Sequence, residues 1–411
     1  MDFPNMIKIR QVFDSSRLEN PAETVSAKLR ESGLLNRIAP GSRIAVTAGS
    51  RGITGIPSIL RAVVEELKRA GAEPFIVPAM GSHGGGTAEG QAAMLGELGI
   101  TETAVGAPVV SSMDTVVLGE TPSGAPVHID RNAYGSDGIV VVNRVKVHTA
   151  FHGRVESGLC KMVVCGLGKK KGVETFHRMG AERNFMECFS CAREKANILC
   201  GVAILENARD ETLDIRVVPP GDFEDADSDL LERCRKIIPH IPFGEFDILI
   251  VDEMGKNISG TGMDTNVIGF WRRYGGEKTP DYSTLIVLSL TPESRGNAMG
   301  IGLADLTTRR LVDSVDFPST YTNAITSQMS LGRIPITLEN DRECLRVALE
   351  KHEQENARIV RIKNTLDLET LLVSENLARD AGVNPNLEIA GESELLRFDN
   401  EGFLDKNVWR G

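Results

Sequence analysis

The chain has 411 residues, which is more than one ordinary hydrophobic core supports, so we expect two domains. Its net charge of -11 argues against a nucleic-acid-binding protein and favours one that handles small molecules. No apolar stretch approaches the roughly 18 residues of a membrane span, and the opening MDFPNMIKIRQVFDSS has no signal-peptide pattern, so we expect a cytoplasmic protein without a membrane partner.

In the first half of the chain, short apolar runs alternate with helical patterns. This rhythm is typical of a mostly parallel sheet with helices on its faces. The predicted strands cover residues 43–49, 73–81, 138–147 and 200–207, and the predicted helices cover residues 57–70 and 87–98.

The second half repeats the alternation after an acidic, proline-containing connector at 219–246, which also bears a helix. Strands are predicted at 247–255, 283–290 and 357–364, and helices at 341–355 and after Asp367. We therefore predict two α/β domains with mostly parallel sheets, 1–240 and 241–411. Ligands of such sheets gather beyond the carboxyl ends of the strands, and we expect the active site in the cleft between the domains.

The loop TAGSRGITGIPS at 47–58 leads from a strand into a helix. Its glycines permit close backbone approach, Thr47, Ser50 and Thr54 offer hydroxyl groups, and Arg51 offers a planar set of donors suited to phosphate. The loop has neither of the two common nucleotide-binding glycine patterns. A phosphate cradle and an ordinary strand-to-helix turn are both compatible with it.

Three histidines follow predicted strands. His83 stands among glycines, where little apolar packing is available, and this favours a chemical role. His148 and His152 would form a metal pair on a helix, but Gly153 and the preceding strand indicate a loop.

Cys188 and Cys191 have the C-x-x-C spacing of metal or redox sites, although no second pair follows. The ordinary interpretation is a helix with a cysteine-rich inner face.

Lys161 interrupts the apolar run GLCKMVV. It either lies on a polar face or turns inward, where loss of solvation would lower the pKa of its amine and make it a better nucleophile. His177, at the end of the same segment, can offer a neutral imidazole to a metal. The residues alone leave these interpretations open.

Four motifs in order, GSHGGGT, NRVKVH, ESGLCKMVV and TFH, resemble those of the nickel-dependent lactate racemase family, the nickel-pincer nucleotide enzymes, over about residues 40–200. The resemblance implies that Lys161, after Ser157 and Gly158, tethers pyridinium-3-thioamide-5-thiocarboxylic acid mononucleotide through a thioamide link. It also implies that His177 binds the nickel, and that His83 and His148 are the acid and base.

The sequence departs from this family in two places. The family's phosphate loop reads S-D-x-T-R-P, whereas Arg51 and Thr54 stand at the corresponding places here. In the second half, a family glutamine and lysine pair has no clear counterpart, and DEMGKNISGTGMDTN, with Lys256, Asn257 and Asp264, is the best candidate segment. The candidate partners for a substrate carboxylate are Arg51, Arg144, Lys146 and Arg154.

The resemblance implies a racemase or epimerase of a 2-hydroxy acid, lactate-like or a sugar acid, that works by hydride transfer and depends on cofactor-biosynthesis proteins. One alternative is a non-catalytic nucleotide- or metabolite-binding protein of the same fold. Another is a zinc-dependent lyase or hydrolase that uses His148, His152 and the cysteines. The oligomeric state is open, a homo-oligomer included.

Overall fold

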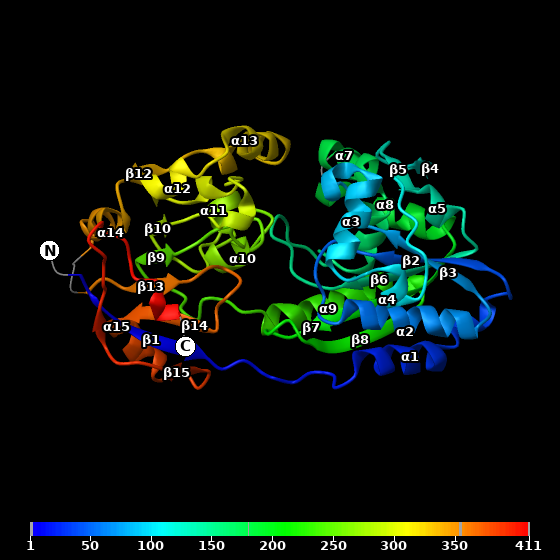
Figure 1. The fold of residues 1–411 in the computed structure, drawn as a ribbon, viewed down its shortest axis with the longest axis horizontal. Coiled ribbons are helices and arrows are strands. Elements are labelled where there is room, and N and C mark those ends of the chain that lie inside the picture. Colours follow the sequence, from blue (N-terminus) through cyan, green and yellow to red (C-terminus); the bar gives the residue numbers. More distant parts are fainter. Residues whose placement is uncertain (1–2, 180, 353–355, 410–411) are drawn as a thin grey trace. The chain divides into compact units, whose positions relative to one another are not determined.

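The computed structural model describes residues 3–179, 181–352 and 356–409, and it describes their side chains except those of 176–179 and 181–184. The chain forms two compact units. The inserted unit is Asp14–Ile238, and the outer unit combines Met1–Phe13 with Pro239–Gly411 (Figure 1). The break at Ile238 lies within the predicted connector, but the first thirteen residues lie with the C-terminal sequence because their strand pairs there.

The inserted unit is built on a five-stranded sheet of order β3-β2-β6-β7-β8. All neighbours are parallel except β7 and β8, which are antiparallel. A separate hairpin is formed by β4 and β5. The strands are β2 (Arg43–Ala48), β3 (Glu73–Pro78), β4 (Thr115–Glu120), β5 (Pro126–Asp130), β6 (Gly138–Arg144), β7 (Ile198–Glu206) and β8 (Thr212–Val218).

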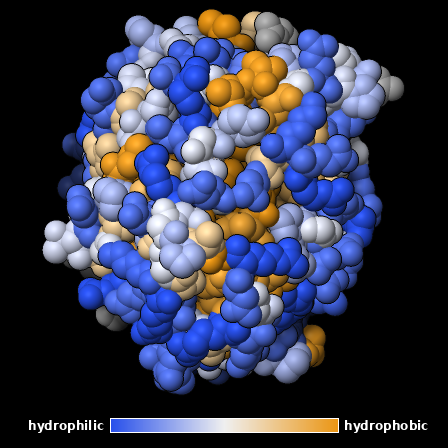
Figure 2. Space-filling view, turned by 90° about the vertical axis from the view of Figure 1, so that its right-hand side faces the viewer, coloured by the Kyte–Doolittle hydropathy of each residue, from blue (hydrophilic) through white to orange (hydrophobic). Residues whose placement is uncertain are grey.

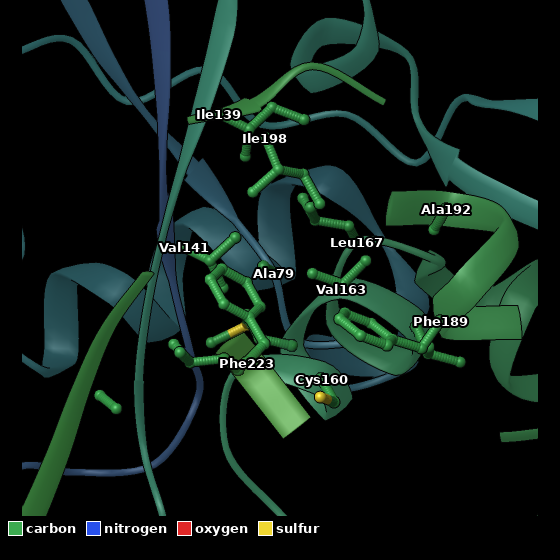
Figure 3. Close-up of a cluster of buried hydrophobic side chains, with 14 of the residues drawn as sticks. Ala79, Ile139, Val141, Cys160, Val163, Leu167, Phe189, Ala192, Ile198 and Phe223 are labelled. Carbon is green, nitrogen blue, oxygen red and sulfur yellow. The ribbon is translucent and has the colours of Figure 1, made fainter. Parts of the chain in front are cut away.

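Helices cover both faces of this sheet because alternate strand residues point to opposite sides. Val140 faces the core under α1 and α2, whereas Val141 faces a second core that includes Phe223 of α9 (Figure 3). The longer helices are α1 (Pro21–Ser32), α2 (Ile56–Arg69), α3 (Ala88–Glu97), α7 (Lys169–Met179), α8 (Ala181–Lys195) and α9 (Phe223–Ile237). Shorter helical segments are η1 (Leu34–Arg37), η2 (Gly84–Gly86), α4 (Glu102–Val105), α5 (Arg131–Tyr134), α6 (Leu159–Lys161), η3 (Met162–Gly166) and η4 (Pro220–Asp222).

The outer unit has a nine-stranded mixed sheet of order β12-β11-β10-β9-β13-β14-β1-β15, with β16 also paired to β1. The neighbouring strands from β12 to β13 in this order are parallel to one another. The pairs β13–β14, β14–β1 and β1–β15 are antiparallel. The strands are β1 (Asn5–Gln11), β9 (Ile248–Val251), β10 (Thr284–Val287), β11 (Leu306–Thr308), β12 (Ile336–Leu338), β13 (Ile359–Ile362), β14 (Thr370–Ser374), β15 (Leu387–Ile389) and β16 (Glu394–Leu395). The predicted α/β class with mostly parallel strands is confirmed.

The helices of the outer unit are short. They are α10 (Thr265–Ile268), α11 (Trp271–Tyr274), α12 (Arg309–Asp313), α13 (Phe317–Thr326), α14 (Asp341–Leu349) and α15 (Glu375–Ala381), with η5 (Pro292–Ser294), η6 (Ile301–Leu303), η7 (Met329–Gly332) and η8 (Asn407–Trp409). The helix predicted after Asp367 is α15, and β14, which was not predicted, lies between Asp367 and this helix.

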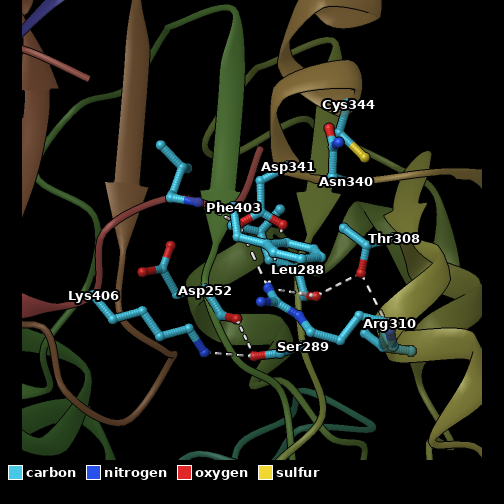
Figure 4. A network of polar contacts seen from close by, with 12 residues as sticks. Asp252, Leu288, Ser289, Thr308, Arg310, Asn340, Asp341, Cys344, Phe403 and Lys406 are labelled. Atoms are coloured by element: carbon cyan, nitrogen blue, oxygen red, sulfur yellow. Dashed lines mark hydrogen bonds and ion pairs between the residues drawn. The ribbon is translucent and has the colours of Figure 1, made fainter. Parts of the chain in front are cut away.

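The last part of the chain closes over strand ends of the outer unit through polar contacts (Figure 4). Leu404 donates its N–H to Asp341 at 2.8 Å, and Lys406 donates to Ser289 at 3.1 Å. The ring of Phe403 lies against the Arg310 guanidinium, 4.2 Å from its centroid. These contacts satisfy groups at the carboxyl ends of β10 and β11 from within the same unit.

The surface view in Figure 2 shows mostly hydrophilic side chains with apolar ones in patches between them. Among the residues that the structure describes, every helix is too short or too polar to span a bilayer.

A fully buried ion pair joins Lys169 and Asp130, with Nζ and Oδ2 3.1 Å apart. Lys169 also donates to the Pro78 carbonyl at the end of β3 and to Gln91 of α3, the latter at 3.1 Å. Burial lowers the pKa of Lys169, and the Asp130 carboxylate opposes this effect. The lysine therefore ties β3, α3 and β5 together.

Exchange of Lys169 for methionine is expected to lower the free energy of unfolding by about 3–5 kcal/mol, because Asp130 would stay buried without its counter-charge. Urea denaturation measures the change. Lys170→Met is the matched control, since that side chain is 56% exposed. Equal stability of the two variants would contradict the assigned role of the buried pair.

Candidate active site

Three loops leave neighbouring parallel strands at one edge of the inserted unit's sheet. They follow β2, β3 and β6, whose carboxyl ends point the same way. A Cβ at Gly49 would lie 3.2 Å from Met162, and one at Gly166 would lie 2.7 Å from the Ala79 carbonyl. Glycine thus allows the first two loops to pack closely around η3, the segment that follows Lys161.

Lys161 stands at the junction between the three-residue helix α6 and η3, which is one π-helical turn. Asn143, near the end of β6, donates its side-chain amide to the Gly158 carbonyl at 2.7 Å. The carboxylate of Asp227 on α9 accepts the N–H groups of Leu159 and Cys160 at 2.9 Å each. The backbone around Lys161 is therefore fixed by hydrogen bonds from β6 and from α9, a helix far away in the sequence.

The Lys161 side chain is half-buried, and none of the described residues forms a hydrogen bond or ion pair with its amine. Loss of solvation lowers the pKa of Lys161, and nearby Arg51 adds to this effect, whereas Cys165 and Glu156 oppose it. A larger fraction of this amine is uncharged at neutral pH than for an ordinary lysine. Of the two interpretations left open by the sequence, the structure favours the inward-facing one.

His83 lies beside this lysine, on the loop after β3. Its Nδ1 forms a short hydrogen bond with Ser50 Oγ, which joins the loops after β2 and β3. The ring keeps an exposed edge, but surrounding protein atoms desolvate it, and Arg51 and Lys161 add positive charge. Together they lower the pKa of His83 to about 4. The imidazole is thus neutral at physiological pH and can accept a proton.

Of the residues predicted to bind phosphate in the loop after β2, some lie near His83 and Lys161 and others form structural contacts. Arg51 is exposed and has no hydrogen-bond or ion-pair partner among the described residues, and it lies close enough to affect His83 and Lys161. Thr47 is fully buried, and its hydroxyl bonds to the backbone of Val142 across the sheet. Thr54 donates its N–H to Glu206 at 2.8 Å. Of this loop, Ser50 and Arg51 lie at the cluster.

His148 is in the loop after β6, at the same edge of the sheet. Its Nδ1 accepts the Ala150 N–H at 3.0 Å, so the neutral ring carries its proton on Nε2. The ring packs on Phe151 with centroids 4.4 Å apart. The prediction of a loop around His148 and His152, rather than a helix, is confirmed.

Glu156, which is fully buried, organises this loop. Its carboxylate accepts the His148 N–H at 2.7 Å and the Gly153 N–H at 3.2 Å, and it pairs with His152 at 3.1 Å and with Arg235 at 2.6 Å. Burial alone would raise the pKa of Glu156, but the hydrogen bonds outweigh it and lower the pKa. The ionised carboxylate fixes the backbone at His148.

Exchange of Glu156 for alanine is expected to lower the free energy of unfolding by about 2–4 kcal/mol, since the N–H groups of His148 and Gly153 lose their buried acceptor and the partly exposed Arg235 loses an ion pair. Urea denaturation measures this loss. Glu224→Ala, which removes an exposed partner of Arg154, is the control and should cost less than about 1 kcal/mol. Equal losses in both variants would contradict the role given to Glu156.

The remaining predicted residues are placed as follows. His177 belongs to α7, but its side chain lies outside the described residues. Ser157 is half-buried and Gly158 buried, directly before α6. Cys188 is buried and Cys191 half-buried on α8, and burial raises the pKa of the Cys188 thiol to about 11. Within the described part of the chain, no three histidine, cysteine or acidic side chains form a group that could hold a metal.

Two of the arginines considered as carboxylate partners are already paired. Arg144 pairs with Glu206, and Arg154 pairs with Glu224 and Asp225 of α9 at 2.5 and 2.6 Å. Lys146 is half-buried on the loop after β6.

The other predicted substrate residues belong to the outer unit. Lys256 donates to the Gly260 carbonyl at 2.7 Å, and Asn257 accepts from Thr291 at 2.7 Å. Asp264 caps α10 by accepting the Asn266 N–H at 2.8 Å.

Sequence reasoning missed Glu156 and Asp227. Glu156 stands at the head of the ESGLCKMVV motif, but a single acidic residue there gave no indication of four partners. Asp227 had a usable signal, because it shares a helical face with Phe223, Leu230 and Leu231, all buried. An acid on an apolar stripe needs buried partners, yet the acidic connector around it masked the pattern.

Residues 9–187 match the family described as "Lactate racemase N-terminal domain". Across 88% of this chain and 99% of the other, the fold is similar to that of the lactate racemase apoprotein from Thermoanaerobacterium thermosaccharolyticum, with a TM-score of 0.53 and 12% identity. A crystal structure of a protein from Thermotoga maritima matches 66% of this chain and 70% of its own at 14% identity, with a TM-score of 0.47. A comparison with curated proteins gives no match.

The chain is therefore an α/β protein whose residues 9–187 are similar to the lactate racemase N-terminal domain and whose fold is similar to that of a lactate racemase apoprotein. The predicted resemblance to the lactate racemase family is confirmed over residues 9–187.

Proposed function

We propose that this protein racemises or epimerises a 2-hydroxy acid with a nickel-pincer nucleotide attached covalently to Lys161. The observation that carries the proposal is the Lys161 amine: it is desolvated, it has no partner among the described residues, and it lies beside His83 and Arg51. A structural lysine would have a carboxylate or carbonyl partner, as Lys169 does.

The described residues fit this cofactor at two points. An amine with a lowered pKa suits attack on an activated thiocarboxyl group, and Arg51, without a partner among the described residues, suits a phosphate or a carboxylate. His177 would be the protein ligand of the nickel by family resemblance. When bound, the cofactor supplies a hydride acceptor, and the protein supplies orientation and proton transfer.

The two histidines would exchange a proton with the substrate hydroxyl. His83 is neutral at physiological pH, and with Nδ1 engaged by Ser50, its Nε2 is the nitrogen available to substrate. The Ala150 N–H occupies Nδ1 of His148, so Nε2 is the nitrogen that would exchange the proton with substrate. Two enantiomers present their hydroxyl groups to opposite sides, so two such groups are required. Glu156 holds the His148 backbone in place for this task.

Co-expression with cofactor-making enzymes tests the proposal. We expect an intact-mass increase on Lys161, stoichiometric nickel, and interconversion of at least one enantiomer pair in a screen of chiral 2-hydroxy acids and aldonic acids, followed by chiral chromatography. An unmodified chain that binds nucleotide reversibly would contradict the proposal and support a non-catalytic binding protein. Zinc without an organic adduct would also contradict it.

A further inference from the structure

We propose that Asp227, which lies 66 residues after Lys161 on α9, is the positioning residue for the Lys161 amine. The inference deepens the proposed function and rests on it, because it concerns how the chain presents its anchor. Asp227 does not contact the amine. It acts through the backbone turn that bears the lysine.

The turn needs an external partner at its start, because α6 begins at Leu159, directly after Gly158, and no side chain of its own caps it. The first N–H groups of any helix have no acceptors within the helix. Asp227 supplies both oxygens to the N–H groups of Leu159 and Cys160, at 2.9 Å each. Its side chain is fully buried, so water does not compete for these bonds.

The Asp227 carboxylate occupies the space that a side chain at position 158 would fill. A Cβ on Gly158 would lie 2.2 Å from Asp227 Oδ1, far inside contact distance. The residue also has φ +126°, a conformation that side-chain-bearing residues rarely adopt. The glycine of the S-G-L-C-K motif therefore has a local reason in this chain: it admits the carboxylate of α9.

Helix α9 is itself immobilised in the core that α6 joins. Phe223, Leu230 and Leu231 belong to the same buried cluster as Leu159 and Cys160, part of which Figure 3 shows. Asp227 is thus a fixed point against which the turn is set. Two residues beyond the bonded N–H of Leu159, Lys161 is directed to its desolvated position near Arg51 and His83.

The test measures the titration of the Lys161 amine in the chain without cofactor, by trace labelling with acetic anhydride from pH 6 to 11 and peptide mass spectrometry. In Asp227→Asn an amide N–H₂ replaces one acceptor, so the turn loosens and the amine regains water. We expect its titration midpoint to rise toward the ordinary lysine value near 10.4, and its labelling at pH 8 to fall by roughly tenfold.

Asp229→Asn is the matched control, because Asp229 lies on the same helix, is 68% exposed and pairs with Arg216. Exposed Lys170 serves as the internal reference in every digest. If Asp227→Asn does not fold, the titration is measured on Asp227→Ser, which keeps one acceptor oxygen. A Lys161 midpoint in a folded Asp227 variant equal to that of the unsubstituted chain overturns the inference. Because no cofactor is present, this result is independent of whether the adduct forms.

Discussion

Exchange of Lys161 for alanine is expected to abolish the covalent adduct and to reduce racemisation to the detection limit. The amine at 161 is the group proposed to form the link, and the described residues around it offer no second lysine without a partner in the same cluster. Lys161→Arg should fail equally, because a guanidinium stays protonated and is not a nucleophile at neutral pH. Intact-mass spectrometry and nickel content after co-expression measure both losses.

The control for this prediction is Lys171→Ala, since Lys171 is exposed on α7. It should keep the adduct, the nickel and the activity. An adduct of unchanged mass on the Lys161→Ala protein would refute the covalent attachment at this residue.

Exchange of His83 for alanine is expected to lower kcat/KM by about 10²–10⁴-fold. The adduct and the nickel should remain, because the variant lacks the group that accepts the substrate proton but keeps the residues proposed to bind the cofactor. Ser50→Ala should cost less, about tenfold, since it removes a hydrogen bond to Nδ1 and leaves the ring.

The pH profile gives a second measurement of His83. Its pKa is lowered from 6.5 to about 4, so the ring stays neutral until the pH falls close to 4. The acidic limb of kcat/KM should therefore lie near pH 4 and not near 6.5, over the range in which circular dichroism shows the protein folded. A limb at pH 6 to 7 would contradict the described environment, and full activity of His83→Ala would remove His83 from the mechanism.

The alternation of strands and helices predicted the α/β class, because buried parallel strands need continuous apolar runs, and residues 43–49 and 138–147 have them. The pattern failed where burial is one-sided or the element is short. Strand β1, with its partly exposed and charged residues, and strand β14, with five residues, were not predicted.

Within the candidate site, the sequence indicated the residues with conspicuous chemistry: His83, Lys161 and Arg51. It did not separate them from neighbours of similar type. Thr47 belongs to the sheet, and Arg154 belongs to a surface ion pair. Those outcomes depend on which way each side chain turns at the end of a strand. The apolar helix face around Asp227 indicated a buried acid, but the sequence did not indicate its partners, which lie 67 and 68 residues away.

The place of β1 between β14 and β15 bears on how this protein can be divided for experiment. A fragment that starts at residue 241 would lack an inner strand, and β14 and β15 would each expose unpaired backbone N–H and C=O groups, a condition that promotes aggregation. Fusing residues 1–13 back through a short linker, with 14–238 excised, keeps the sheet whole. The unit that bears Lys161 is inserted in the sequence of the outer unit, so truncated forms for expression should end at the insertion points, residues 13 and 239.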